Sequence, residues 1–226
     1  MQRPGADHPS DAREFAHQRA LMVERHVAAR GVTDPRVLQA MRDVPRHLFV
    51  PPGVAAKAYG PSALPIGQKQ TISQPYIVGR MIELLELSGS EKVLEIGTGT
   101  GYQAAVLSRI AGRVFSIERI SELALRAVET IRQLRYQNVS VKVFDGTYGW
   151  SDQAPFDRII VAAAAPEVPE PLVQQLARGG RLVLPIGPAG RQRLARVTRV
   201  ATRLQIEDCG AAEFVPLVGR FGWKDE

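Results

Sequence analysis

Apolar runs alternate with amphipathic stretches through the middle of the chain. Short apolar runs bounded by turn residues predict buried strands, and stretches with apolar positions at helical spacing predict helices. Their alternation predicts βαβ units, and hence an α/β fold with a mostly parallel sheet and helices on both faces. The predicted strands are KVLEI (92–96), RVFSIE (113–118), VSVKVF (139–144), DRIIVAA (157–163) and RLVLPI (181–186), with helices over 102–111, 122–135 and 171–177 and a turn at Gly179-Gly180.

The pattern changes on either side of this region. The run ARVTRVATRLQIED (195–208) has no helical stretch between its apolar segments, which predicts antiparallel strands completing the sheet. Upstream, spaced apolar residues predict a helix over 11–31. Asp34 and Pro35 predict the start of a second helix, as its N-cap and first residue, and Pro45 is expected to end it. These helices are expected to cap the sheet.

Two segments lack such periodicity. Residues 1–10 combine Pro and Gly with polar residues and are expected to form a disordered tail. Residues 49–75 are rich in Pro and Gly and are expected to form a long irregular loop, which in a compact domain is usually functional. A helix is then expected from about Ser73 to Leu87, leading into strand 92–96.

Composition fits one globular domain. The chain has 226 residues, of which 45% are hydrophobic and 23% are charged. A single core stops growing at about 250 to 300 residues, so one α/β domain accounts for the length. We expect a loose or helical extension over 1–20 and a single domain over 21–226, whose first part, 21–75, holds the N-terminal helices and an active-site loop.

Charge, cysteine and histidine usage narrow the classes of function. The net charge is +6, but Lys and Arg are interleaved with acids rather than gathered in a run, so no nucleic-acid partner is predicted. The only cysteine, Cys209, excludes an intrachain disulfide and fits a cytoplasmic protein. No leader-like segment begins the chain and no run of about 18 apolar residues occurs, so no membrane association is predicted. The histidines lack the spacing of a helical metal pair, so no metal is predicted.

A glycine-rich segment, VLEIGTGTGY (93–102), lies directly after a predicted strand and before a predicted helix. Glycines in this context let the backbone turn sharply and a ligand approach closely. The spacing G-x-G-x-G differs from the G-x-G-x-x-G of dinucleotide sites. Glu95 is expected to point an anion into the crevice, where it repels a pyrophosphate but attracts the ammonium and sulfonium of S-adenosylmethionine. The predicted contacts of this cofactor are Glu95, Gly97, Thr98, Gly99 and Gly101.

Two more acids follow the next strands. Glu118 ends strand 113–118, and Asp145-Gly146 follows strand 139–144. The carboxyl ends of successive parallel strands meet at a switch point, so these acids are expected to line one crevice. Glu118 is expected to accept hydrogen bonds from the ribose, and Asp145 from the adenine amino group while Gly146 admits the ring. Two alternatives stay open, namely a surface ion pair for Glu118 and a plain turn at Asp145-Gly146.

The acceptor of a methyl group must lie in front of the sulfonium, because the transfer is an in-line displacement. The helix that begins near Ser73 is expected to run antiparallel to strand 92–96, so its N-terminus returns to the carboxyl end of that strand. Its free N–H groups suit an anionic acceptor. An ordinary N-cap is the alternative role for Ser73. The residues expected beside the methionine end of the cofactor are Thr71, Ile72, Ser73 and Gln74.

Six motifs over most of the chain carry a family resemblance. They are VPRHLFVPP (44–52), ALPIGQKQTISQPYIVGRM (63–81), VLEIGTGTGY (93–102), APFDRIIV (154–161), GGRLVLPIG (179–187) and FVPL (214–217). From about Met22 to Trp223 the sequence resembles the protein-L-isoaspartate O-methyltransferases, a family of protein-repair carboxyl methyltransferases. TISQP together with LPIGQ is specific, whereas the glycine turn alone indicates only a methyltransferase.

The resemblance implies a Rossmann-like class I methyltransferase that uses S-adenosylmethionine to esterify the α-carboxyl of L-isoaspartyl residues in damaged proteins and peptides. The ester then collapses to a succinimide, whose hydrolysis restores some normal aspartyl. It also implies that Ser73 is the active-site serine, that Glu118 and Asp145-Gly146 hold the cofactor with the turn, and that Val215, Pro216 and Leu217 line the peptide cleft. A monomer is expected.

The acceptor chemistry constrains Ser73. A carboxyl group with a pKa near 4 is already ionised at neutral pH, so it needs no general base to become a nucleophile. We therefore hypothesise that Ser73 positions the acceptor carboxylate and forms no covalent intermediate. Three rival readings stay open: a methyltransferase of the same fold acting on RNA or a small molecule, a noncatalytic binder of damaged peptides, and an NAD-dependent oxidoreductase, which the turn spacing disfavours.

Overall fold

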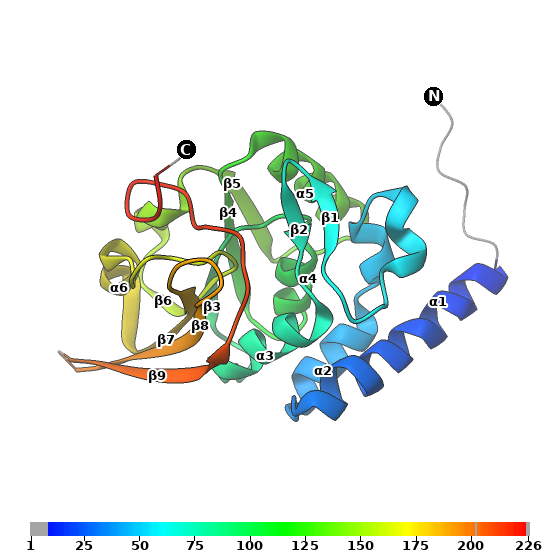
Figure 1. The fold of residues 1–226 in the computed structure, drawn as a ribbon, viewed down its shortest axis with the longest axis horizontal. Coiled ribbons are helices and arrows are strands. Elements are labelled where there is room, and N and C mark those ends of the chain that lie inside the picture. Colours follow the sequence, from blue (N-terminus) through cyan, green and yellow to red (C-terminus); the bar gives the residue numbers. More distant parts are fainter. Residues whose placement is uncertain (1–8, 202, 225–226) are drawn as a thin grey trace.

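A mixed sheet with helices on both faces forms the centre of the molecule (Figure 1). The computed structural model describes residues 9–201 and 203–224. The strands in this part are β1 (Leu64–Gly67), β2 (Gln70–Ile72), β3 (Lys92–Ile96), β4 (Arg113–Glu118), β5 (Val139–Val143), β6 (Phe156–Val161), β7 (Leu176–Ile186), β8 (Arg193–Val200) and β9 (Arg203–Ala211). The α-helices are α1 (Pro9–Met22), α2 (Pro35–Asp43), α3 (Pro75–Leu85), α4 (Tyr102–Ser108), α5 (Ser121–Gln133) and α6 (Glu170–Gln175). Short 3-10 or π segments are η1 (Val23–Val27), η2 (Ala28–Arg30), η3 (Arg46–Phe49), η4 (Pro52–Lys57), η5 (Gly146–Tyr148) and η6 (Ser151–Gln153).

The strand order reverses at β3: β4 and β5 are added on one side of it, and β6 to β9 on the other. The order among the described strands is β5-β4-β3-β6-β7-β8-β9, with β1 and β2 in a separate hairpin. β3 pairs in parallel with β4 on one side and with β6 on the other, whereas β8 and β9 continue antiparallel from β7. The predicted mostly parallel sheet with antiparallel C-terminal strands is confirmed. In such sheets, ligands bind at the carboxyl ends of the strands that flank the switch point.

Two core layers lie on the two faces of the sheet. On one face, Val93 of β3 and Val114 of β4 pack with the buried sides of α3 and α4. On the other face, Leu94 and Phe115 pack with Leu172 of α6. Because side chains alternate along a strand, β3 and β4 must be apolar on both faces, which explains their nearly continuous apolar sequences. The predicted helices on both faces are confirmed (Figure 1).

The N-terminal helices form a cap beside α3 and α4 (Figure 1). α1, η1 and η2 follow one another without a break and end at Gly31, whose φ of +100° stops the helix. The carboxylate of Asp34 accepts from the backbone N of Arg36 at 2.8 Å, and Pro35 is the first residue of α2. The predicted end at Gly31 and the predicted cap at Asp34 are both confirmed.

The prediction of an irregular loop over 49–75 is wrong in its second half. The segment contains η4 and the antiparallel hairpin β1–β2. The hairpin turns through Gln68 and Lys69, which have φ of 54° and 55°. These residues lack the Asn-Gly signature that marks such turns, so no sequence pattern predicts the hairpin. α3 begins at Pro75 with Gln74 as N-cap, so Ser73 precedes the helix and is not its cap.

The predicted start of the strand at 181 is also wrong. β7 begins at Leu176, directly after α6, and its pairing jumps from Phe156–Leu176 to Arg158–Arg181. The backbone of Gly179, with φ of +74°, lies inside this irregularity. The two glycines therefore mark a bulge within a strand rather than a turn before it. Most of the predicted tail, residues 1–8, lies outside the described residues.

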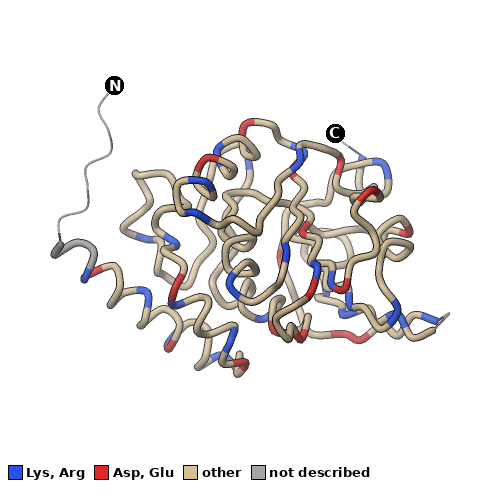
Figure 2. Tube along the Cα trace, turned by 180° about the vertical axis from the view of Figure 1, so that it is seen from behind, with Lys and Arg blue, Asp and Glu red and all other residues tan. Residues whose placement is uncertain are grey.

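Charged residues are spread over the molecule (Figure 2). Lys and Arg positions alternate with Asp and Glu positions along the trace, and several pair, as Arg196 does with Glu86 and Glu207. Within the part of the chain that the structure describes, no helix is long and apolar enough to cross a membrane, and no group of three or more His, Cys, Asp or Glu could hold a metal ion.

Candidate active site

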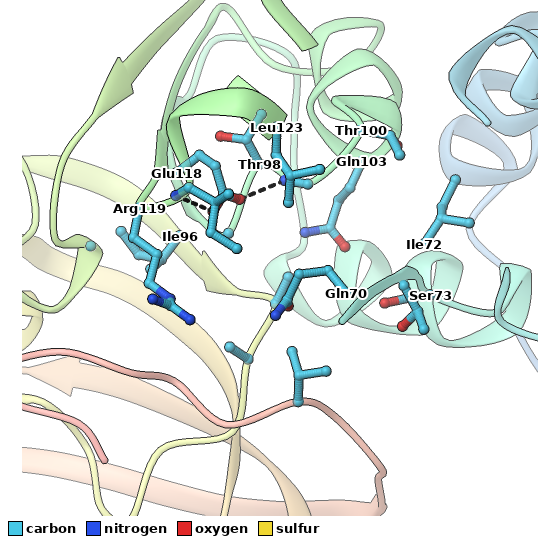
Figure 3. A pocket seen from close by; sticks show the side chains of 18 of the residues that line it. Gln70, Ile72, Ser73, Ile96, Thr98, Thr100, Gln103, Glu118, Arg119 and Leu123 are labelled. Atoms are coloured by element: carbon cyan, nitrogen blue, oxygen red, sulfur yellow. Dashed lines mark hydrogen bonds between the residues drawn. The ribbon is translucent and has the colours of Figure 1, made fainter. Parts of the chain in front are cut away.

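A cavity opens at the switch point, where the carboxyl ends of β3, β4 and β6 meet (Figure 3). The space between its walls, counted together with the open solvent at its mouth, is about 830 Å³. The glycine turn and the strand ends, at 96–100 and 117–120, form one wall. Two segments far apart in the sequence, 70–73 and 215–218, form the other. The topology thus brings the predicted cofactor and acceptor residues to one place.

The glycine turn is fixed to the end of β4 by backbone hydrogen bonds. Gly97 N donates to Ile117 O at 2.8 Å, and the φ angles of Gly97 and Gly99 are +91° and +55°. Both glycines and Thr98 line the cavity. Gly101 does not line it; a Cβ there would lie 3.1 Å from Ile131 Cδ1 of α5. Gly101 therefore serves the packing of α5, in contrast to its predicted contact with the cofactor.

Glu118 clamps the turn from the neighbouring strand. One carboxylate oxygen, Oε2, accepts from Gly99 N at 2.9 Å, and Oε1 accepts from Ile120 N at 3.0 Å (Figure 3). The side chain is 6% exposed and lines the cavity. A carboxylate has further lone pairs after accepting these two bonds, so it can also accept from ligand hydroxyls.

Glu95 lies behind the cavity wall rather than in it. Its side chain is fully buried, accepting from Gln103 Nε2 at 3.1 Å and from the Ser116 hydroxyl. Burial raises the pKa of Glu95 to about 8, and the nearby charge of Glu118 adds to this. This shift favours the protonated carboxyl of Glu95 over the carboxylate. The expectation that it presents an anion to the crevice is wrong, and Gln103, which lines the cavity, stands in its place.

Asp145 organises the chain instead of lining the cavity. Its Oδ1 accepts from Thr147 N at 2.9 Å and from Thr147 Oγ1 at 2.7 Å, and its Oδ2 accepts from Arg220 N at 2.9 Å. This geometry favours the turn that was left open as the alternative to an adenine contact. Gly146 does line the cavity, and a Cβ there would lie 2.4 Å from Ile96 Cγ2, so only glycine fits.

The acceptor segment before α3 lines the cavity through Thr71, Ile72 and Ser73. The Ser73 hydroxyl makes no hydrogen bond with any residue that the structure describes, whereas the Ser73 carbonyl accepts from a buried arginine, Arg46. Gln74 does not line the cavity, because its side chain turns away and accepts from Arg30 Nη1 at 3.2 Å. Its predicted substrate contact is therefore not supported.

The C-terminal segment crosses the mouth of the cavity as a strap, which we define as 214–223. Val215, Pro216 and Leu217, which are predicted to line a peptide cleft, all line the cavity. Ala164 N donates to Val215 O, and Leu217 N donates to Ala164 O, both at 2.8 Å. The indole N of Trp223 donates to the same Ala164 carbonyl at 2.9 Å. The strap is thus hydrogen-bonded to the backbone of Ala164, which follows β6 in the chain.

Several residues that line the cavity are not predicted as site residues from the sequence. Gln70 lies on a hairpin that no pattern predicted, and Arg119 and Leu123 follow the end of β4. The side chains of Gln70, Gln103 and Arg119 extend into the cavity (Figure 3). Gln103 could have been found from helical spacing, because the second residue of the helix after a glycine turn faces the strand ends. The turn geometry of Gln70 offered no such signal.

The chemistry of the lining is simple. Among the lining residues that the structure describes, Glu118 is the carboxylate and Arg119 the cation; the others are apolar, amide or hydroxyl-bearing side chains and bare backbone. Such a site can hold and orient two ligands but offers no histidine, lysine or free carboxylate as a proton acceptor. The doubly wound sheet, its switch-point glycine turn and the carboxylate on the next strand define a class I methyltransferase.

Comparison with known proteins narrows this class to one family. Residues 17–222 match the family model of protein-L-isoaspartate(D-aspartate) O-methyltransferase. A protein-L-isoaspartate O-methyltransferase of Geobacter metallireducens is 54% identical, covering 94% of this chain and 99% of its own, and one of Syntrophus aciditrophicus is 52% identical, covering 92% and 97%. The chain belongs to the protein-L-isoaspartate(D-aspartate) O-methyltransferase family.

Solved structures agree with this assignment. A protein-L-isoaspartate O-methyltransferase with 28% identity has a TM-score of 0.81, covering 92% of this chain and 67% of its own. A Plasmodium falciparum protein solved in complex with S-adenosyl-L-homocysteine has 24% identity and a TM-score of 0.74, covering 87% and 96%; it supports the fold alone.

Proposed function

We propose that this protein transfers a methyl group from S-adenosylmethionine to the α-carboxyl of L-isoaspartyl residues in damaged proteins, which starts their repair to aspartyl through a succinimide. The observation that carries the proposal is a juxtaposition. The glycine turn and the Ser73 hydroxyl line one cavity whose described residues include no general base. An acceptor that is ionised before it binds fits such a site, and a carboxylate is that acceptor.

The cofactor side of the cavity suits S-adenosylmethionine. Gly97, Gly99 and Gly146 bring bare backbone to the wall, and a Cβ at Gly146 would collide with Ile96. Glu118 is held in place by two backbone N–H groups and keeps lone pairs for the ribose hydroxyls. Thr98 completes this wall. When bound, the cofactor supplies a methyl group on a sulfonium, which needs no metal or proton donor to be transferred.

The acceptor side orients the carboxylate. Ser73 has a hydroxyl that no described residue occupies, so it can donate to one oxygen of the acceptor while the other faces the methyl group. Thr71 and Ile72 line the approach, and Val215, Pro216 and Leu217 of the strap cover the opposite side. Closure between these segments excludes water, which strengthens the electrostatic interactions inside. Positioning, rather than proton transfer, is therefore the contribution of Ser73.

The acceptor class follows from the family and from charge. The protein is an enzyme whose partners are isoaspartyl-containing proteins and peptides. Esterification removes the negative charge of the α-carboxyl, so the following backbone amide nitrogen can attack it with loss of methanol and form the succinimide. That collapse takes place after release and needs no residue of this chain.

We further propose that the protein acts as a monomer in the cytoplasm, without a nucleic-acid partner, and that 21–226 form one domain behind an extension over 1–20. The interleaved charges and the single cysteine, Cys209, support this. Size-exclusion chromatography with light scattering tests the proposed monomeric state, since a stable dimer would scatter light with twice the molecular mass of the chain.

A repair assay tests the proposed function. An isoaspartyl peptide is incubated with the protein and labelled S-adenosylmethionine, and label and peptide isomers are followed in time. We expect label in the isoaspartyl peptide, followed by succinimide and then aspartyl peptide, and no label in the aspartyl twin. Label in neither peptide, or equal label in both, contradicts the proposal. Binding of the isoaspartyl peptide without any transfer would identify a noncatalytic binder instead.

A further inference from the structure

Arg46 is a charged side chain buried directly behind the acceptor segment. It is the first residue of η3 and its exposure is 0%. Its Nε donates to Ala58 O at 2.8 Å, and its Nη2 donates to Ser73 O at 2.7 Å. The guanidinium carbon lies 4.8 Å from the ring centroid of Tyr102, which begins α4 after the glycine turn. One side chain thus joins the loop before β1, the acceptor segment and the helix that follows the turn.

The charge of Arg46 has no counter-ion among residues 9–201 and 203–224. No carboxylate of the described residues forms an ion pair with it, and neither its Nη1 nor the Tyr102 hydroxyl makes a hydrogen bond of normal geometry within the described part of the chain. Burial lowers the pKa of the guanidinium, although the nearby Tyr102 partly opposes this. An arginine nonetheless stays protonated in a protein. The site therefore holds a full positive charge in a medium that screens it weakly.

Stability alone does not explain such a residue. Burying an ion is costly, and an apolar side chain of similar size is often tolerated as well or better at such positions. Two carbonyl acceptors and one aromatic face offset part of this cost. The bond to the Ser73 carbonyl links Arg46 to the site, because the same residue lines the cavity where an anionic acceptor is to be held.

We propose that Arg46 is a positioning residue for the acceptor, which fixes Ser73 through its carbonyl and supplies the buried positive charge that draws the acceptor carboxylate to the segment 71–73. This proposal rests on the proposed function. Arg46 does not line the cavity, so it acts through Ser73 and through its field rather than by contact.

The reaction itself says which kinetic constant should respond. As the methyl group passes from sulfonium to carboxylate, the positive charge on the cofactor and the negative charge on the acceptor are both lost. A fixed cation behind Ser73 therefore interacts more strongly with the bound carboxylate than with the transition state. Interactions of this kind lower KM and do not raise kcat. A purely structural clamp would instead disturb cofactor affinity as well, since Tyr102 follows the turn directly.

Two substitutions separate charge from geometry. Arg46→Met keeps an unbranched apolar side chain and removes the charge and the donors to Ala58 O and Ser73 O. Arg46→Lys keeps the charge, but its ammonium cannot span the Ala58 and Ser73 carbonyls as the planar guanidinium does. Arg19→Met is the matched control, because Arg19 also donates to a backbone carbonyl, that of Arg42, and contacts Tyr59, but it makes no contact with the acceptor segment.

The measurements are KM and kcat for an isoaspartyl peptide, the affinity for S-adenosylhomocysteine by titration calorimetry, and the melting temperature. We expect Arg46→Met to raise the peptide KM at least about tenfold, because the acceptor carboxylate loses the attraction of the buried charge and Ser73 loses the donor that fixes its carbonyl. The kcat and the S-adenosylhomocysteine affinity should change by less than about threefold on the same scale. Arg46→Lys should give an intermediate KM, and Arg19→Met should leave KM unchanged.

An unchanged KM in Arg46→Met, or a parallel loss of S-adenosylhomocysteine affinity, overturns the proposal. If Arg46→Met does not fold, Arg46→Lys decides: a raised KM with wild-type S-adenosylhomocysteine affinity supports the role, and a wild-type KM overturns it. Activity of the wild-type protein shows whether the proposed function or only the role of Arg46 has failed. Absence of wild-type transfer to the isoaspartyl peptide would refute the proposed function, whereas normal wild-type transfer with an unchanged variant KM refutes only the role of Arg46.

Discussion

The two walls of the cavity are built by different means. The cofactor wall is the end of the sheet itself, where Gly97 N donates to Ile117 O and Glu118 accepts from Gly99 N and Ile120 N. The acceptor wall is made of a hairpin and a strap that lie outside the main sheet and are held by a few side chains and by two backbone bonds to Ala164. The first wall is fixed by the fold, whereas the second depends on a few anchors. Changes in the two walls should therefore have separable effects on cofactor and acceptor.

The anchors of the acceptor wall are spread over distant parts of the chain. The hairpin is held where Arg126 Nη2 donates to Ile66 O at 3.1 Å, and the acceptor segment where Arg46 donates to Ser73 O. The strap is held by the carboxylate of Asp145 and by the backbone of Ala164. Each of these segments is thus tied to the rest of the protein by a few bonds and not by the full backbone ladder of a strand. Such regions open at a lower free energy than the sheet does, which suits the entry of a peptide.

The largest expected effect is on the cofactor wall. Glu118→Ala removes the carboxylate that accepts from two backbone N–H groups and, as proposed, from the ribose. Charge-assisted hydrogen bonds contribute about 1.5–3 kcal/mol each, so the affinity for S-adenosylhomocysteine should fall roughly 100-fold. Titration calorimetry measures this, and Glu118→Gln, which keeps one acceptor oxygen, should lose less. A wild-type affinity in Glu118→Ala would mean that the turn alone holds the cofactor.

A smaller effect is expected from Ser73→Ala, on the acceptor side only. Loss of one hydrogen bond to a charged acceptor should lower kcat/KM for an isoaspartyl peptide about tenfold. The affinity for S-adenosylhomocysteine should stay within experimental error of wild type, because Ser73 holds no bond to the turn. Steady-state kinetics and calorimetry measure the two quantities. A methylated or acylated Ser73 found by mass spectrometry in the wild-type protein would refute its positioning role.

The strap gives the third effect. Asp145→Asn keeps the oxygen that caps η5 but replaces the oxygen that accepts from Arg220 N, so it loosens only the strap. We expect the peptide KM to rise about threefold, because Arg220 N loses its charged acceptor while the strap keeps its bonds to Ala164, with unchanged S-adenosylhomocysteine affinity. Asp145→Ala removes both functions and should also lower the melting temperature. A loss of cofactor affinity in Asp145→Asn at constant KM would instead restore the adenine contact predicted from the sequence.

The smallest effect on turnover, and a distinct one on stability, is expected at Glu95. Its pKa is raised to about 8 in the folded protein from an ordinary value of 4.5, so the folded state retains a proton that the unfolded state loses. The stability contribution is present below about pH 4.5 and is lost as the pH rises towards 8, by at most about 1.4 kcal/mol per pH unit. Glu95→Gln cannot ionise and should lack this dependence.

Urea unfolding of the wild type and of Glu95→Gln at pH 5.5 and at pH 7.5 measures how the free energy of unfolding of each protein changes with pH. The first pH lies about one unit above the pKa of Glu95 in the unfolded chain, and the second lies just below its pKa in the folded protein. The stability of Glu95→Gln relative to wild type should increase between the two conditions. Equal pH dependence in both proteins would show that Glu95 is ionised in the fold and would return the anion to the neighbourhood of the cofactor.

The sequence predicted the cofactor wall better than the acceptor wall, for physical reasons. The strands around the switch point are buried on both faces, so their apolar runs stand out whatever the surroundings. The ends of these strands place Gly97, Gly99 and Glu118 at one edge by topology alone. The hairpin β1–β2 is different, because Gln68 and Lys69 adopt left-handed backbone conformations that only tertiary contacts make favourable.

Side-chain direction accounts for the other errors. Glu95 was assigned to the crevice by its distance from the first glycine, but it shares a strand face with Val93, which packs against the helices. Strand alternation contained this information, since residues two apart share a face. Gly101 and Gln74 fit the family motifs equally well, yet one meets α5 and the other turns to Arg30. Motif membership identifies a segment, whereas the structure decides which of its side chains face the ligand.

A competition between two peptides measures the acceptor specificity of the protein. An isoaspartyl peptide and its aspartyl twin of identical sequence are mixed in equal amounts with the protein and S-adenosylmethionine, and methyl esters on each are counted by mass spectrometry after separation. We expect ester on the isoaspartyl peptide alone, with the same preference at a lower rate in Ser73→Ala. Equal esterification of the twins, or none of either, would contradict the proposed function.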